Sequence, residues 1–165
     1  MKQLLLYIIT TIFLFSCSSR LETALDSANA NRAELEKVLE HFKNDKNPLK
    51  YEAAVFLIEN MQHQYTYHGE AVDKLDKLYL STSTVSLNKR TEFFNNHATE
   101  LLSKGSLHPS FDINGIKADY LIKAIDDACE VWCRTPWHEE YDKSVFFEYV
   151  LPYRLDHEPL SDWRN

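Results

Sequence analysis

Two cysteines in the last third of the chain are the residues whose type and spacing come closest to chemistry. Cys129 and Cys133 are four residues apart, which puts both on one face of a helix. Side chains that run parallel on one helix face do not reach the torsion of about 90° that a disulfide needs. We therefore expect two reduced, partly buried thiols. We do not expect either to be a nucleophile, because no helix N-terminus or fixed cation stands nearby to lower a thiol pKa.

Histidines could complete a metal site with these thiols or form one of their own. A structural metal site takes about four ligands, and His138 is the one further candidate close to Cys133, beyond Pro136. His63 and His68 lie five residues apart in a segment that we predict to be a loop, with no third ligand in view. We expect solvated histidines, and neither a metal nor a cofactor.

Paired carboxylates across a cleft are the remaining route to catalysis. Glu148 with Asp142 or His138 could be assembled into such a pair. The spacing instead favours Asp142 as the cap of a final helix and Glu148 on its solvated face. The sequence therefore predicts that the chain is not an enzyme in its own right.

The composition limits the class of protein. The 165 residues correspond to about one domain, and 3 glycines and 5 prolines argue against β-sandwiches, barrels and glycine-rich phosphate loops. The net charge of −7 has the wrong sign for nucleic-acid binding. We predict an all-α protein, an antiparallel bundle of about five to six helices with an extended C-terminal tail and no nucleic-acid partner.

The N-terminus predicts the compartment. An apolar run over residues 4–15 follows a lysine and leads to Ser16 and Cys17. The run is shorter than the roughly 20 residues of a spanning helix and reads as a signal peptide. A small residue directly before a cysteine resembles the lipobox of bacterial lipoproteins, which implies cleavage after Ser16 and acylation of Cys17, palmitate being a typical chain. Ser18, rather than an aspartate, favours the outer membrane of a Gram-negative cell. The alternative is an ordinary secreted protein.

Apolar periodicity predicts the elements that follow. We expect residues 17–30 to form a tether or frayed helix, and Asn31 with Glu34 to cap the first helix of the bundle. Further helices are predicted over residues 49–61, 72–79, 86–104, 117–134 and 142–151, with turns over residues 44–48 and 112–115 and a loop over residues 62–69. Inward-facing residues are predicted in three of these helices. They are Phe93, Phe94, Ala98, Leu101 and Leu102 in the helix over residues 86–104; Tyr120, Leu121, Ala124, Ile125, Ala128, Val131 and Trp132 in the helix over residues 117–134; and Phe146, Tyr149 and Val150 in the last.

The tail over residues 153–165 is too apolar to remain fully exposed to solvent. Its Leu160 and Trp163 need a surface to pack on. We expect Tyr153, Arg154, Leu160 and Trp163 to form a docking strip for a following or separate domain. The alternative is that the tail folds back on the helices of its own chain.

Several short segments carry a resemblance to a known family. They are residues 122–128, Val131-Trp132, Pro136-Trp137, residues 147–154 with the sequence FEYVLPYR, residues 158–160 and Trp163-Arg164. They resemble the helical region ahead of the catalytic core in transglutaminase-like lipoproteins of Bacteroidetes. The papain-like core of that family, with its Cys, His and Asp, would follow Arg164, so no cysteine of this sequence matches the family nucleophile. The resemblance implies a truncated reading frame or a helical module that has become independent.

Two functions follow as expectations. The first is a membrane-anchored, non-catalytic module that positions a transglutaminase-like core domain, with a signal peptide over residues 1–16, a tether over 17–30, a helical domain over 31–152 and a tail over 153–165. The second is a free-standing envelope lipoprotein that binds glycan or peptide. For the second, Trp137, Tyr141, Tyr153 and Trp163 would offer stacking faces, although aromatic residues at helical spacing usually fill a core.

Overall fold

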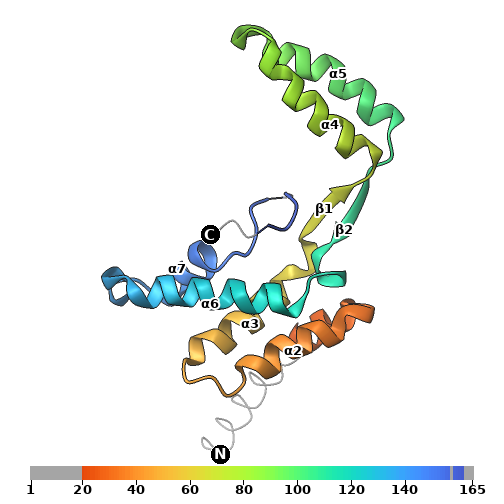
Figure 1. Cartoon of the computed structure of the whole chain (residues 1–165). Helices are drawn as coiled ribbons and strands as arrows, with labels where there is room; N and C mark the ends of the chain where they lie inside the picture. Colours follow the sequence, from red (N-terminus) through yellow and green to blue (C-terminus); the bar gives the residue numbers. More distant parts are fainter. Residues whose placement is uncertain (1–19, 157, 162–165) are drawn as a thin grey trace, which may run out of the picture. The chain divides into compact units, whose positions relative to one another are not determined.

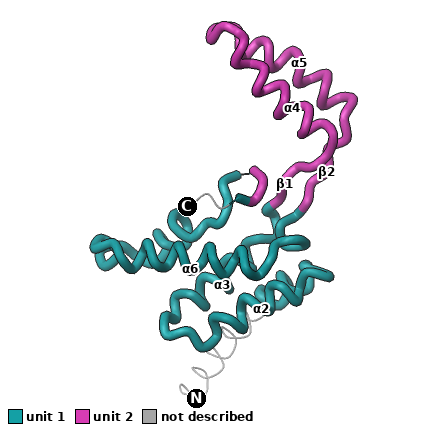
Figure 2. The backbone as a smooth tube through the Cα atoms, in the orientation of Figure 1, with its two compact units in different colours: residues 1–64, 111–156, 161–165 teal, residues 65–110, 157–160 magenta. Residues whose placement is uncertain are grey.

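The computed structural model describes residues 20–156 and 158–161 (Figure 1). Figure 2 shows these residues divided into two compact units. Of the described residues, unit 1 takes 20–64, 111–156 and 161, and unit 2 takes 65–110 and 158–160. Helices dominate both units, so the predicted all-α class is confirmed. Where we expected a single helical domain over residues 31–152, the structure has unit 2 inserted into the sequence of unit 1.

Unit 1 is built around three longer helices. They are α2 (Arg32–Phe42), α3 (Pro48–Asn60) and α6 (Ala118–Arg134). Short helical turns lie between and after them: Asn29–Asn31, Met61–His63, Asp112–Asn114 and Pro136–Glu139. The helix α7 (Lys143–Val145) continues into a π-helical turn, Phe146–Val150.

The segment before α2 is part of the core of unit 1. Residues 20–27 are helical, and Ala24, Leu25 and Ala28 are buried among the core side chains. We had expected a tether or a frayed helix here. The polar composition of this segment suggests a tether, but Ala24 and Ala28 are small and lie on one helix face, which allows close packing against a partner helix.

The α2–α3 hairpin has the turn chemistry that its sequence predicts. The Asn47 side chain accepts a hydrogen bond from the backbone N–H of Leu49 at 3.1 Å, and Pro48 occupies the first helical position. Asp45 in turn accepts from the backbone N–H of Asn47 at 2.8 Å. Helix α3 begins and ends within one residue of its predicted bounds.

Helix α6 contributes the longest buried stripe. Its buried residues are Ala118, Leu121, Ala124, Ile125, Ala128, Cys129 and Trp132. All but Ala118 and Cys129 were predicted to lie on this face. Val131 was predicted there too, but it is 40% exposed, whereas the neighbouring Trp132 is buried.

The last helix departs from its predicted inward face. Phe146 is buried as expected, but Tyr149 is 77% exposed. The backbone N–H of Leu151 donates to the carbonyl of Phe146 at 2.8 Å, five residues back. This wider π turn moves position i+3 away from the core and brings Leu151, which is fully buried, onto the face predicted for Tyr149.

Unit 2 contains a small sheet that the sequence analysis missed. Strand β1 (Tyr65–His68) pairs with β2 (His108–Phe111), although we had predicted a loop over residues 62–69. Gly69 follows β1 with φ of 130°, and a Cβ there would lie 2.4 Å from the carbonyl oxygen of Ser106. Only glycine fits this position, which leads directly into the next helix.

The rest of unit 2 is a helical hairpin, α4 (Glu70–Ser81) and α5 (Arg90–Lys104), joined by short turns at Thr82–Thr84 and Leu87–Lys89. Of the predicted core face of α5 only Ala98 is buried, whereas Phe93, Phe94 and Leu101 are half-buried and Leu102 is 48% exposed. Two helices alone cannot enclose large side chains. None of the helices in the described part of the chain is long and apolar enough to cross a membrane.

Candidate functional site

The start of α2 holds the chain segment that leads into α6. The Asn31 side chain does not cap its own helix as predicted; its Nδ2 donates to the carbonyls of Ile113 (3.0 Å) and Ile116 (2.9 Å). The Glu34 carboxylate accepts from the backbone N–H of Ala118 at 2.9 Å. That N–H holds the pKa of Glu34 below its usual range. The two predicted capping residues therefore fix a turn more than 80 residues further along the chain.

This turn presents Asp112 to the C-terminal tail inside unit 1. The backbone N–H of Asp112 donates to the carbonyl of Gln64 at 2.9 Å. Its Oδ2 accepts two hydrogen bonds, from Tyr153 Oη at 2.8 Å and from Arg154 Nη1 at 2.5 Å. All three side chains are buried, with Asp112 and Arg154 at 5% and 8% exposure. A buried charge is stable only when it is paired in this way.

The cluster formed by Asp112, Tyr153 and Arg154 is shielded from water. Burial, and then the negative charge of Asp112, raise the pKa of the Tyr153 phenol far above its usual range. The Nε of Arg154 donates to the carbonyl of Asp156 at 2.7 Å. Asp156 has a positive φ of 46°, a conformation that turns the chain sharply. Arg154 thus joins a core carboxylate to the tail backbone.

A second contact fixes the tail on α6. The hydroxyl of Tyr120 lies 2.9 Å from the carbonyl of Tyr153 and 3.0 Å from the carbonyl of Ser161, and it shares its one proton between them. The rings of Tyr120 and Tyr153 meet edge to face with centroids 6.4 Å apart. We call Asp112, Tyr120, Tyr153 and Arg154 the tail clamp.

The tail clamp separates the predicted docking residues into two kinds. Tyr153 and Arg154 are buried in their own unit, so they are not on a docking surface; the prediction treated them as exposed because Asp112 is some 40 residues away in sequence. Leu160 is 37% exposed and Leu155 is 54% exposed. Trp163 and the predicted lipidation residue Cys17 lie outside the described residues.

The two thiols are free, Cys129 buried and Cys133 exposed. Burial is the main cause that raises the pKa of Cys129 to about 12. At neutral pH this thiol is therefore protonated and a poor nucleophile. The Sγ of Cys133 lies 3.8 Å from Asn47 Nδ2.

The predicted histidine candidates are separated by the fold. His138 packs its ring 6.2 Å from that of Trp132, and its Nδ1 lies 2.6 Å from the carbonyl of Thr135. His63 and His68 are exposed and belong to different units. Over residues 20–156 and 158–161, no group of three or more His, Cys, Asp or Glu side chains is placed to hold a metal ion.

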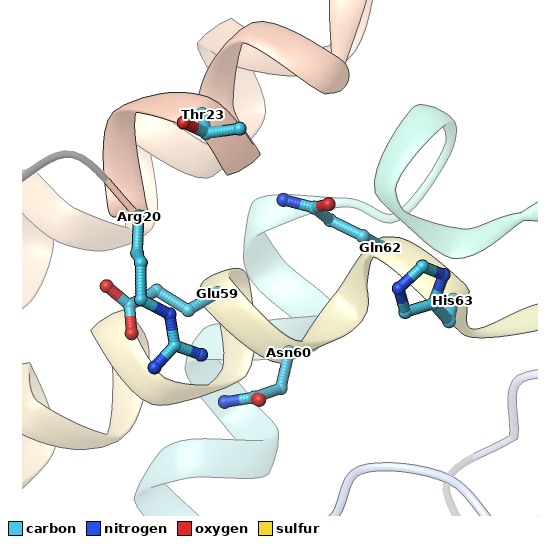
Figure 3. Close-up of a pocket in the computed structure, with 6 residues that line it drawn as sticks. All are labelled: Arg20, Thr23, Glu59, Asn60, Gln62 and His63. Carbon is cyan, nitrogen blue, oxygen red and sulfur yellow. The ribbon is translucent and has the colours of Figure 1, made fainter.

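One open pocket of about 350 Å³ lies in unit 1 beside the end of α3 (Figure 3). Figure 3 shows Arg20 and Thr23 coming from the N-terminal helix, and Glu59, Asn60, Gln62 and His63 from α3 and the turn after it. The Oε1 of Glu59 is buried and has no hydrogen-bond partner among the residues that the structure describes. The pocket is polar and open, without the apolar lining of most small-molecule sites.

The two carboxylates considered for catalysis lie where their spacing in the sequence favours them. Asp142 caps α7, as predicted, by accepting from the backbone N–H of Ser144 at 2.8 Å, and this bond lowers its pKa. Glu148 is exposed.

The aromatic residues divide between core and surface. Trp137 and Tyr141 are both partly exposed and meet edge to face, with centroids 6.0 Å apart. Trp137 also contacts the buried Trp132 at 5.2 Å. Of the four residues considered for ligand stacking, this pair alone is both described and on the surface, since Tyr153 is buried.

Comparison with protein-family models, with curated proteins and with solved structures finds no match for this chain. The tail clamp and the surface near it are therefore interpreted from their own geometry.

Proposed function

We propose that the protein is an envelope lipoprotein, anchored by lipid on Cys17, that acts as a non-catalytic helical module and positions a papain-like, transglutaminase-like domain. The observation that carries the proposal is that both ends of the described chain are fixed on unit 1. Ala24 and Leu25 pack in its core near the beginning, and the tail clamp holds the chain up to Ser161.

This arrangement suits a positioning role. A domain that follows the tail or docks on it would keep a fixed place relative to the segment that leads to Cys17. The tail clamp supports this, because a buried ion pair and a shared hydroxyl restrain the tail more than surface contacts would. We assign Tyr153 and Arg154 to holding the tail, and Leu160, which is exposed, to contact with the partner domain.

The assignment of catalysis to a partner is supported by the chemistry of the buried thiol. A nucleophilic cysteine requires a lowered pKa, and burial raises that of Cys129. In the proposal the papain-like domain supplies the nucleophile, and this chain positions that domain and attaches it to the membrane.

Site-specific photocrosslinking in cells tests the proposal. A photoreactive phenylalanine analogue at Leu160 should crosslink to a papain-like domain, in the same polypeptide or in a separate one. The same analogue at Tyr149, which is exposed on the last helix, is the matched control and should not. Equal crosslinking from both positions, or crosslinking from Leu160 only to proteins of other folds, would contradict the proposed docking.

A second function is favoured by the surface pair Trp137 and Tyr141. Partly exposed aromatic rings can stack on sugar rings or peptide side chains, which suits an envelope lipoprotein that binds glycan or peptide. Trp137→Ala should then abolish binding to a soluble glycan or peptide library, while Tyr149→Ala, a change at an exposed tyrosine of the same unit, should leave it unchanged.

A further inference from the structure

The end of the α4–α5 hairpin that lies opposite the sheet has an unusual surface. We call residues 78–88 the hairpin tip. Figure 1 shows α4 and α5 side by side, with β1 and β2 at one end of them and the hairpin tip at the other. Tyr79, Leu80 and Leu87 are 69%, 71% and 83% exposed. These are among the most exposed large apolar side chains in the described part of the protein.

The hairpin tip lacks charge. Residues 78–88, LYLSTSTVSLN, contain no acidic or basic side chain. Acidic and basic residues are equal in number over residues 65–110, so the net charge of −7 arises elsewhere in the chain. Lys77, Lys89 and Arg90 flank the hairpin tip, with Asp76 and Glu92 beside them. An uncharged apolar end bordered by charged residues matches the layering of a bilayer surface, where acyl chains lie below charged headgroups.

The hydroxyl groups of the hairpin tip find hydrogen-bond acceptors within it. Each hydroxyl in the run of residues 81–84 donates to the carbonyl three residues before it, at 2.6–2.8 Å. Arg90 covers two further carbonyls, through Nε to Val85 at 2.9 Å and Nη2 to Ser83 at 3.2 Å. Ser86 donates to the side chain of Asn88 at 3.0 Å. Chain that enters an apolar phase must satisfy its polar groups internally, and these bonds do so for every hydroxyl of residues 81–86.

From this combination we infer that the hairpin tip inserts into the interface of a lipid bilayer, with Leu80, Leu87 and Tyr79 among the acyl chains. A second copy of the protein is a less suitable partner for the hairpin tip than a bilayer. Side-by-side pairing of hairpins needs an apolar stripe along the helices, whereas the middle of α5 exposes Asn95, Asn96 and Thr99. The inference does not depend on the lipid at Cys17, because the tip residues themselves contact the bilayer.

A local probe tests the insertion. The full chain carries Cys17→Ala, Cys129→Ala and Cys133→Ser, and a single cysteine is then introduced as Leu87→Cys or, for comparison, Thr99→Cys in the middle of α5. Each is labelled with the environment-sensitive fluorophore NBD and mixed with vesicles of phosphatidylethanolamine and phosphatidylglycerol. At position 87 the emission should shift to the blue and be quenched by nitroxide lipids, while position 99 stays unchanged.

Substitutions in the same background test which side chains carry the insertion. Leu80→Ser should raise the lipid concentration at half-maximal shift roughly tenfold, because an apolar side chain no longer enters the bilayer. Leu102→Ser, a change at an exposed leucine near the sheet end of α5, should leave it unchanged. Vesicles of phosphatidylcholine alone should give nearly the same result, because the acidic neighbours offset most of the flanking positive charge.

Three results would overturn the inference. No shift at position 87 would mean that the hairpin tip stays in water. Equal shifts at positions 87 and 99 would mean that the hairpin lies flat on the surface. A shift at position 87 that rises with protein concentration in the absence of vesicles would identify a second copy as the occupant. The anchor at Cys17 is removed throughout, so these results are independent of the proposed lipidation.

Discussion

The carboxylate of Glu34 caps a helix in a distant part of the sequence: its Oε2 accepts the backbone N–H of Ala118 at 2.9 Å, 84 residues away. Ala118 begins α6, where N–H groups lack partners within the helix. A carboxylate at this position also interacts favourably with the positive end of the helix dipole. Since the turn before Ala118 carries Asp112, Glu34 helps to place the residue at the centre of the tail clamp.

The first prediction concerns the pH dependence of this cap. The pKa of Glu34 is lowered in the folded protein, so its contribution to stability is full above the pKa of an unfolded glutamate and is lost as the pH falls through the folded pKa. Glu34→Gln should lower the Tm by several degrees at neutral pH and by less in acid, where the wild-type carboxylate is also protonated. Glu40→Gln, which affects an exposed pair with Lys43, is the control. If Glu34→Gln lowers the Tm by the same amount at both pH values, the cap does not depend on the charge of Glu34.

The second prediction concerns the buried ion pair. Arg154→Met leaves the Asp112 carboxylate without its cation and should cost about 3–5 kcal/mol of unfolding free energy. Tyr153→Phe removes one hydrogen bond to that carboxylate and should cost about 1.5–3 kcal/mol, which keeps the test open if the first variant does not fold. Denaturant unfolding followed by tryptophan fluorescence measures both.

Arg134→Met is the matched control for the ion pair, because Arg134 makes only an exposed contact with Glu130 at 3.6 Å and should cost little. If Arg154→Met lowers the free energy of unfolding no more than Arg134→Met does, the Asp112–Arg154 pair does not stabilise unit 1.

The third prediction concerns thiol reactivity. At about pH 8 iodoacetamide should modify Cys133 and leave Cys129 unmodified, because Cys129 is buried and its pKa is raised to about 12. Cys129 should react only when denaturant unfolds the chain. Peptide mass spectrometry locates the modification, and Cys133→Ser confirms the assignment. Modification of Cys129 at the rate of Cys133 in the native protein would be inconsistent with its burial.

The fourth prediction concerns the tail. Removing residues 156–165 takes away the Asp156 carbonyl that accepts from Arg154 Nε. A buried donor without a partner costs about 1–3 kcal/mol, so the Tm should fall. Removing only residues 162–165 keeps this contact and the one from Tyr120 to Ser161, and should preserve the Tm. If both truncations behave alike, the tail is not held by these contacts.

Sequence patterns correctly predicted those elements that depend on residues close together in the chain. The stripe of α6 follows from its period, and the turn at Asn47-Pro48 and the cap at Asp142 follow from side chains within two residues of the groups they bind. Strand β1 was missed because its partner lies some 40 residues away, and four residues carry too little alternation to indicate a strand.

The same limit applies to the candidate site. Asp112 was recognised only as part of a turn, because nothing near it in sequence indicates Tyr153 and Arg154 as partners. The inward place of Leu151 depends on a π turn, which shifts the helical register and leaves Tyr149 exposed. Pairings of this kind are decided by tertiary packing, which a single sequence does not display.

The central claim, that lipid on Cys17 holds this module to the membrane, is tested most directly by the mass and location of the protein produced in a Gram-negative host. The account predicts a chain that begins at Cys17, carries the added mass of a diacylglycerol and an N-acyl chain, and stays in the membrane pellet after high salt and carbonate. Cys17→Ala should lack this mass and be released by the same washes. A wild-type chain without added mass, or a Cys17→Ala chain that stays in the pellet, would contradict the claim.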